Sequence, residues 1–218
     1  MISIIIPTHY RERLWLQSQL YQRIKETAPW VEVIAVSDNP EIYERIRGDK
    51  VVKLPNWIGW TKQMNIGEKF ASNDIVGHMD DSCQIVNKGW AEMALEDLRR
   101  EFPDGMGVVE ISGVKDCWSR GISTRNYLYS LNLGNMFWPE YIHGGDEEIY
   151  HRSKDKFYCR PGLLQETKYT DKSGTVVNKL KEYDEDLFNR RKEQDFPLKF
   201  QPEWTVRTRR YGFKVSQD

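Results

Sequence analysis

The sequence is poor in cysteine. Cys83, Cys117 and Cys159 are the only three in 218 residues, and no two of them are spaced as a CxxC pair. This pattern excludes a disulfide framework and a cysteine-based zinc site, and it is typical of a reducing compartment. The sequence also lacks a secretion-signal pattern and any apolar run near the roughly 20 residues that span a membrane. We therefore expect a soluble protein without a transmembrane segment that works in the cytoplasm, or in the host cytoplasm if its source is a virus.

An excess of charge of one sign is missing as well. The 32 lysines and arginines nearly balance the 33 aspartates and glutamates, and the net charge of −1 argues against a uniformly basic nucleic-acid-binding protein. The charge is nevertheless unevenly distributed. Residues 188–214 contain eight basic and three acidic side chains, a balance of +5, which leaves −6 for the rest of the chain. We interpret this basic end either as a solvated helix and tail or as a surface for an anionic acceptor such as a lipid phosphate or DNA.

What the sequence does contain is an alternation of strand-like and helix-like segments. Apolar runs predict buried strands at residues 2–7, 31–36, 51–54 and 74–79, and periodic apolar positions predict helices at 11–27, 41–47 and 61–70. The less regular second half predicts helices at 90–102 and 183–191, a strand at 108–114, and a flexible loop with a further strand within 119–133. The alternation predicts a single-domain α/β fold, Rossmann-related, with a mainly parallel central sheet flanked by helices.

Polar clusters follow the predicted strands. They are Pro7-Thr8-His9-Tyr10-Arg11, Asp38, Asp80-Asp81-Ser82 and, after an aromatic stretch, Gly144-Gly145-Asp146-Glu147-Glu148. In open α/β sheets, ligands bind at the carboxyl ends of the strands. Two adjacent carboxylates there repel each other, and a divalent cation that grips a diphosphate would relieve the repulsion. The alternative is a solvated turn for the aspartates and the acidic first turn of a helix for Glu147 and Glu148.

These segments resemble the GT-A-fold glycosyltransferases of family 2. The opening ISIIIPTHYRERL is similar to the first strand and loop of that family, and VEVIAVSDNP is similar to its second strand. The stretch from NWIGW to MDDSCQIVNKGW resembles the segment that ends in the metal-binding acidic motif, and GGDEE resembles the acceptor-side motif. The resemblance covers residues 1–150, with the motifs in the family's order. It implies a GT-A-like fold with a nucleotide-binding half (1–82), an acceptor-side half (83–187) and a basic C-terminal segment (188–218).

The resemblance implies a role for each matching residue. Those implied to bind the nucleotide are Pro7, Thr8, Arg11, Asp38, Lys62, Asn65 and Asp80. Asp80 and Asp81 would hold Mn²⁺ or Mg²⁺, Glu147 would be the general base with Asp146 beside it, and Trp138 and Gly145 would line the acceptor or sugar site. The implied partners are a nucleotide-sugar donor, with UDP as the nucleotide, and an acceptor that is a glycan or a modified base in DNA.

The sequence departs from the family pattern at the third metal ligand. Where a later histidine is usual, the chain offers Gln165, and His151 follows Glu147 too closely. The cation would then depend on the aspartates and the diphosphate. An inverting transferase is the leading hypothesis, with a retaining enzyme as a variant. A nucleotidyltransferase, which needs a glycine-rich loop that Pro7-Thr8-His9 lacks, and a non-catalytic carbohydrate- or nucleic-acid-binding module are the alternatives.

Overall fold

The structure, a computed structural model, describes residues 1–166 and 174–198. Its main sheet has seven strands in the order β3-β2-β1-β4-β7-β6-β8. These strands are β1 (Ile2–Pro7), β2 (Glu32–Ser37), β3 (Lys50–Lys53), β4 (Ile75–His78), β6 (Val108–Glu110), β7 (Gly121–Thr124) and β8 (Phe157–Cys159). Strands β3, β2, β1 and β4 are parallel, whereas β7 is antiparallel to both β4 and β6. The predicted mainly parallel α/β sheet is therefore confirmed.

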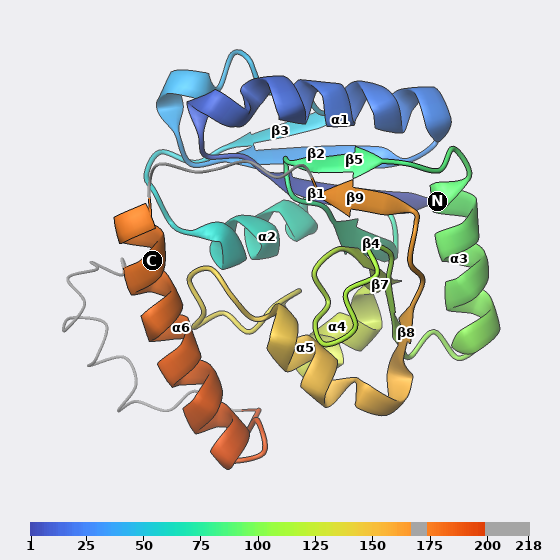
Figure 1. The fold of residues 1–218 in the computed structure, drawn as a ribbon, viewed down its shortest axis with the longest axis vertical. Coiled ribbons are helices and arrows are strands. Elements are labelled where there is room, and N and C mark those ends of the chain that lie inside the picture. The colour runs from blue at the N-terminus through green and yellow to red at the C-terminus, as the bar shows by residue number, and fades with distance from the viewer. Residues whose placement is uncertain (167–173, 199–218) are drawn as a thin grey trace.

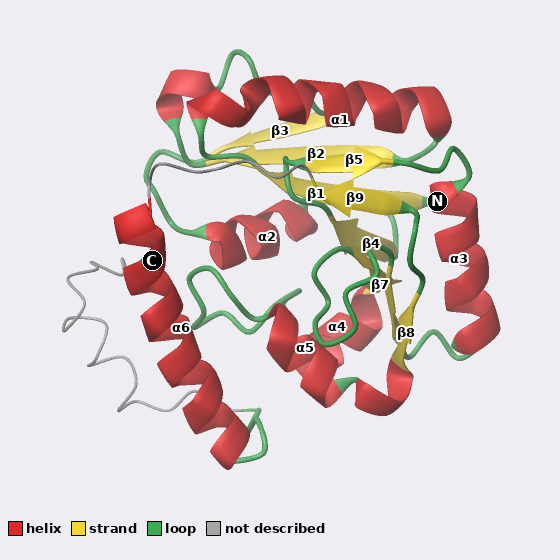
Figure 2. Ribbon diagram, in the orientation of Figure 1, coloured by secondary structure: helices red, strands yellow, loops and turns green. Residues whose placement is uncertain are grey.

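Helices cover both faces of the sheet (Figures 1 and 2). They are α1 (Leu14–Thr27), α2 (Trp60–Lys69), α3 (Trp90–Glu101), α4 (Arg125–Leu131), α5 (Asp146–Arg152) and α6 (Gly174–Glu193), with 3-10 turns at Arg11–Arg13, Pro40–Ile42 and Lys154–Lys156. Alternation along β1 divides the core: Ile4 packs with Leu20 of α1, and Ile5 packs on the opposite face with Met64 of α2. The apolar first strand is thus buried from both sides, as its continuous run predicts.

The second half differs from the sequence prediction in its details. The segment 119–133, expected as a loop with a strand, forms β7 followed directly by helix α4, whose N-cap Thr124 accepts a hydrogen bond from Tyr127 N. The strand expected at 108–114 ends at Glu110, and the helix expected at 41–47 is only the 3-10 turn at Pro40–Ile42. A small antiparallel sheet of β5 (Cys83–Ile85) and β9 (Leu164–Glu166), absent from the prediction, adds a second layer beside α1.

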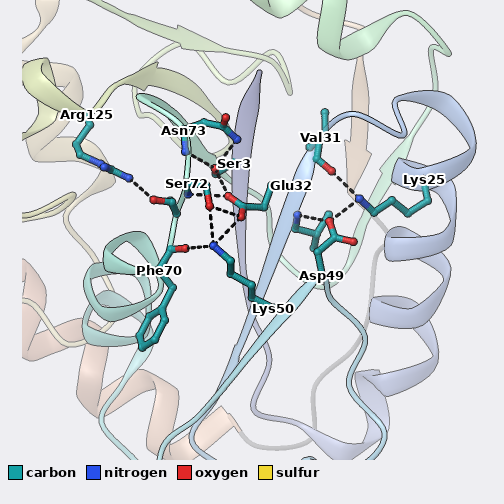
Figure 3. A network of polar contacts seen from close by, with 12 residues as sticks. Ser3, Lys25, Val31, Glu32, Asp49, Lys50, Phe70, Ser72, Asn73 and Arg125 are labelled. Atoms are coloured by element: carbon teal, nitrogen blue, oxygen red, sulfur yellow. Dashed lines mark hydrogen bonds and ion pairs between the residues drawn. The ribbon is translucent and has the colours of Figure 1, made fainter.

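A polar network ties together the amino ends of four parallel strands (Figure 3). Glu32 accepts hydrogen bonds from Ser3 Oγ at 2.5 Å and Ser72 N at 2.8 Å, and it forms an ion pair with Lys50 at 2.8 Å. Burial alone would raise the pKa of Glu32, but these bonds outweigh it and lower the pKa to about 2. The network stabilises the amino ends of these strands. The polar residues that follow the strands lie at the opposite, carboxyl ends.

Among the described helices, none combines the length and the apolar character needed to cross a bilayer.

Candidate active site

The carboxyl ends of β2, β1 and β4 lie next to one another because these strands are neighbours in the sheet. They present Asp38, the Thr8-His9 pair and the Asp80-Asp81 pair in that order. Chain order reverses around β1, with β2 on one side and β4 on the other, and such a reversal is where open α/β sheets form a ligand crevice. At its floor, Thr8 Oγ1 is buried and has no hydrogen-bond partner among the described residues.

Asp80 and Asp81 each face an arginine. Arg120 Nη2 lies 2.6 Å from Asp80 Oδ2, and Arg13 Nη1 lies 3.5 Å from Asp81 Oδ1. The side chain of Asp80 keeps 28% of its surface exposed, whereas that of Asp81 is buried. Burial raises the pKa of Asp81 to about 7; Arg13 opposes the increase and the charge of Asp80 adds to it. The two acids are thus neighbouring carboxylates, each already paired with an arginine.

Asp38 and His9 form a second polar pair at this edge. His9 Nδ1 lies 2.5 Å from Asp38 Oδ1, and Ile58 N donates to Asp38 Oδ2 at 2.9 Å. The carboxylate of Asp38 is completely buried, while the imidazole of His9 is 32% exposed. The histidine therefore forms the surface of the pair and the aspartate its support.

A turn at residues 142–145 brings α5 to the site. Asp184 of α6 accepts hydrogen bonds from the main-chain nitrogens of residues 142, 143 and 144 at 3.0, 2.7 and 2.7 Å. Thr61 Oγ1, at the start of α2, donates to the oxygen of Gly144 at 2.7 Å. Gly145 then takes φ +114°, a conformation that residues with a side chain rarely adopt. Two helices and one glycine thus set the direction in which α5 begins.

Asp146 and Glu147 begin α5, and they differ in environment. Asp146 is half-buried and Glu147 is exposed. Burial raises the pKa of Asp146; a hydrogen bond with Cys117 opposes the increase, and the charges of Glu147 and Asp80 add to it. Arg120 pairs with Asp80 at 2.6 Å and Trp118 N donates to the main-chain oxygen of Asp146 at 3.1 Å, so the segment 118–120 connects the end of β4 with the start of α5.

The fold of this chain can be compared with those of known proteins. No family model matches the chain, and no curated protein matches it. Among solved structures, mannosyltransferase PcManGT from Pyrobaculum calidifontis, in complex with GDP-Man and Mn²⁺, is 14% identical with a TM-score of 0.60 over 84% of this chain and 60% of that chain. Glucosyl-3-phosphoglycerate synthase from Mycobacterium tuberculosis, in complex with Mn²⁺, UDP and glucosyl-3-phosphoglycerate, is 14% identical with a TM-score of 0.60 over 84% and 76% of the two chains. TarS of S. aureus is 15% identical with a TM-score of 0.55, and the match covers 73% of this chain but only 35% of TarS.

The chain has the GT-A fold. Identities of 14–15% establish the fold alone, and the chain spans 60% or less of two of these three proteins.

Several predicted residues gather at the strand-end edge of the GT-A sheet. Asp38, Asp80 and Asp81 lie there, and Pro7 and Thr8 are buried beneath them. Lys62, in the first turn of α2, has no ion-pair partner among the described residues, and burial lowers its pKa. Arg11 is exposed in the 3-10 turn that precedes α1. The start of α5 is connected to this edge through residues 118–120, since Trp118 N bonds the main-chain oxygen of Asp146 and Arg120 pairs with Asp80.

Two predicted residues have structural roles in this GT-A chain. Asn65 uses both ends of its amide on the main chain of Phe137, at 2.8 and 3.1 Å, so its polar atoms are already occupied. Trp138 is fully buried beneath Arg191, whose guanidinium carbon lies 3.6 Å from the indole centroid. An indole in that position cannot form the wall of an acceptor site. We therefore exclude Asn65 and Trp138 from the candidate site.

The structure also adds residues that the sequence does not reveal. Arg13 and Arg120 pair with the two aspartates, and Asp184 and Arg191 of α6 hold the turn and α5. Glu148 is not a solvated acid of a helix start, since Arg191 Nε and Nη2 each lie 2.6 Å from its carboxylate and both side chains are fully buried. Partners separated by 40 residues or more, such as Asp184 and Gly144, leave no local pattern to detect. The basic stretch of residues 199–214 lies outside the described residues.

The candidate metal site has few possible ligands among the described residues. Among residues 1–166 and 174–198, no cluster of three or more histidine, cysteine or acidic side chains could enclose a metal ion. Asp80 and Asp81 supply two hard carboxylate donors of the kind that Mn²⁺ and Mg²⁺ accept. Gln165 is exposed on β9, and His151 packs against Phe188 and Phe196. The residues therefore fit a cation whose remaining ligands come from a bound diphosphate and water.

Proposed function

We propose that this chain is a metal-assisted glycosyltransferase that moves a sugar from a UDP-sugar to a hydroxyl acceptor with inversion at the anomeric carbon. The observation that carries the proposal is that residues 118–120 join two acidic segments at the strand-end edge of a GT-A sheet: Arg120 Nη2 lies 2.6 Å from Asp80 Oδ2, and Trp118 N donates to the main-chain oxygen of Asp146 at 3.1 Å. One element of the pair belongs to the candidate donor site and the other to the acceptor-side motif. The likeness to GT-A structures solved with Mn²⁺ and UDP or GDP-Man supports the same reaction class.

The donor side combines a carboxylate pair with nearby basic groups. Asp80 and Asp81 would hold Mn²⁺ or Mg²⁺, which neutralises the charge that develops on the departing diphosphate. Arg13 and Arg120 contact the two aspartates, and together with Lys62 of α2 they would contact phosphate oxygens. Thr8 Oγ1, buried without a partner, is a further donor at the floor of the crevice.

On the acceptor side, Glu147 would act as the general base. Glu147 is exposed at the start of α5, where an acceptor hydroxyl can reach it. The hydroxyl oxygen attacks the anomeric carbon as the bond to the diphosphate breaks. The bonding pair leaves with the nucleoside diphosphate, and the hydroxyl proton passes to the Glu147 carboxylate. The main-chain oxygen of Asp146, which accepts a hydrogen bond from Trp118 N at 3.1 Å, connects the start of α5 to the segment whose Arg120 pairs with Asp80.

The class of acceptor follows from what surrounds Glu147. We propose a glycan or another hydroxyl-bearing acceptor. DNA with a hydroxylated base is the alternative, which would use the basic segment 188–214. The 142–144 turn and Gly145 directly precede Glu147, and the half-buried indole of Trp60 lies 6.3 Å from the ring of His143 in this turn, centroid to centroid.

Calorimetric titration with UDP tests the donor site. We expect UDP to bind in the presence of Mn²⁺ and to bind much more weakly after EDTA treatment or in the Asp80→Asn variant. Equal binding with and without Mn²⁺ would remove the metal from the proposal. A complete absence of nucleotide binding would leave only the non-catalytic module.

Replacing Glu147 with glutamine tests the base. Because the amide keeps the shape but cannot take a proton, we expect transfer to fall by roughly 10²- to 10⁴-fold while UDP affinity is unchanged. Glu96→Gln, an exposed acid on the distant helix α3, is the matched control. Full turnover by the Glu147 variant would exclude this residue as the base, and NMR of the product's anomeric configuration decides between inversion and retention.

A further inference from the structure

We infer that His9, supported by Asp38, reads the hydrogen-bonding edge of the nucleobase, and that it selects bases with an imino N–H, such as uracil. The inference rests on the proposed function, because it requires a nucleotide in this crevice. The juxtaposition of a fully buried carboxylate and a 32% exposed imidazole carries it. The resemblance to family 2 implies that Asp38 contacts the base, but the side chain of Asp38 has no exposed surface with which to make that contact.

Both oxygens of Asp38 already have donors inside the protein. Oδ1 faces His9 Nδ1 at 2.5 Å, and Oδ2 accepts the main-chain N–H of Ile58 at 2.9 Å. A base that approached the carboxylate directly would have to displace the imidazole. The simpler arrangement keeps the histidine in place and uses its outer edge.

The imidazole is held in one orientation. In addition to the contact with Asp38, the main-chain oxygen of His9 accepts a hydrogen bond from Asn39 Nδ2 at 2.8 Å. The ring of Tyr10 lies edge-on with its centroid 5.0 Å away. A side chain fixed in this way loses little conformational freedom when a ligand binds, which makes it suited to recognition.

The support of Asp38 determines what His9 offers. Because the carboxylate accepts a hydrogen bond, Nδ1 of the neutral imidazole carries the hydrogen and Nε2 is left as an acceptor. Nε2 has no partner among the described residues. An acceptor at this point matches the N3–H of uracil or the N1–H of guanine. It is mismatched with N3 of cytosine, which is itself an acceptor.

The position agrees with a nucleotide bound through its diphosphate. Arg13 contacts Asp81 at 3.5 Å and lies over the ring of Tyr10, 5.2 Å from its centroid. Tyr10 in turn meets His9 edge-on at 5.0 Å, so this series of contacts brings His9 and Asp81 into one region of the crevice. A diphosphate at the Asp80-Asp81 pair therefore has its nucleoside within reach of His9.

The test compares UDP with 3-methyl-UDP, in which the imino hydrogen is replaced, by calorimetry in the presence of Mn²⁺. We expect the wild-type protein to bind UDP about fivefold to tenfold more tightly than 3-methyl-UDP or CDP. His9→Asn keeps a donor toward Asp38 and removes Nε2, so it should bind UDP and 3-methyl-UDP equally. His9→Gln, whose amide oxygen lies near the position of Nε2, should recover part of the preference.

The outcomes separate the two proposals. Equal binding of UDP and 3-methyl-UDP by the wild-type protein, or unchanged discrimination in His9→Asn, would overturn the role of His9 and leave the glycosyltransferase standing. If no nucleoside diphosphate binds the wild-type protein, both proposals are wrong. The comparison of the two ligands on the wild-type protein needs no variant, so a folding defect in either histidine variant cannot obscure the answer.

Discussion

Replacing Arg191 with methionine tests how helix α6 is held against helix α5 and the segment around Trp138. Arg191 and Glu148 are both fully buried, with two contacts of 2.6 Å between them, and the guanidinium stacks on Trp138 at 3.6 Å. Methionine fills much of the same volume but removes the charge. Glu148 would then be a buried carboxylate without its main counter-charge.

The size of the effect follows from the remaining partners of Glu148. Removing one member of a buried ion pair typically costs about 3–5 kcal/mol. Arg152 Nη1 at 3.2 Å and the hydroxyl of Tyr141 at 2.9 Å stay in place and offset part of the loss. We therefore expect the free energy of unfolding to fall by about 3 kcal/mol, at the lower end of that range.

Urea unfolding followed by tryptophan fluorescence measures the change, with the double variant Arg191→Met/Glu148→Met as the decisive control. Because the double variant also removes the buried carboxylate, we expect it to recover part of the lost stability; Arg152, 3.2 Å from Glu148 in the wild-type protein, loses this partner and limits the recovery. Arg190→Met, which removes a neighbouring ion pair with the part-exposed Asp186, should cost less than about 1 kcal/mol. A loss below about 1 kcal/mol in Arg191→Met, or a double variant no more stable than the single one, would refute the reasoning.

Two further predictions concern Glu32, at the amino ends of the parallel strands, and the turn at residues 142–144. Glu32→Gln should lose about 3 kcal/mol of stability at pH 7 but almost none near pH 2. The pKa of Glu32 in the folded protein, about 2, lies below the ordinary value of 4.5. The stabilisation is therefore complete above pH 5 and disappears as the pH falls from 4.5 to 2. Urea unfolding at several pH values checks this, and a pH-independent loss would contradict it. The asparagine of the Asp184→Asn variant can accept fewer of the three main-chain hydrogen bonds of the 142–144 turn. We therefore expect roughly tenfold slower sugar transfer with unchanged UDP affinity. A change in UDP affinity alone would show that the turn does not serve the acceptor side.

The predictability of this chain differs between its two halves for a physical reason. In the first half, each strand is a continuous apolar run such as Ile2–Pro7, buried on both faces, and the polar residues that follow it must lie at one edge. In the second half, β6 and β7 are three and four residues long, and α4 begins at once after β7, so the apolar pattern has no room to show its period. The strand-end acids were therefore predictable, whereas the partners of those acids were not.

Trp138 and Asp38 show where a motif stops being informative. The motif places each residue in the correct segment, but its exposure depends on partners contributed from elsewhere. Arg191, 53 positions after Trp138, covers the indole, and His9, 29 positions before Asp38, covers the carboxylate. In both cases a residue far away in the sequence decides whether the motif residue is exposed.

The charge balance of the strand-end site explains how it can exist without a third acidic ligand. Asp80 and Asp81 are matched by Arg120 and Arg13, so the four side chains are close to neutral together. A divalent cation alone would make this group strongly positive and would have to compete with two arginines for the same oxygens. Under the proposed function, a cation that arrives with a UDP-sugar, whose diphosphate carries two negative charges, would add almost no net charge. The arginines could then turn from the aspartates to the phosphate oxygens while the aspartates turn to the cation, so that no charge is left uncompensated. We therefore expect the metal and the nucleotide to bind together rather than the metal alone.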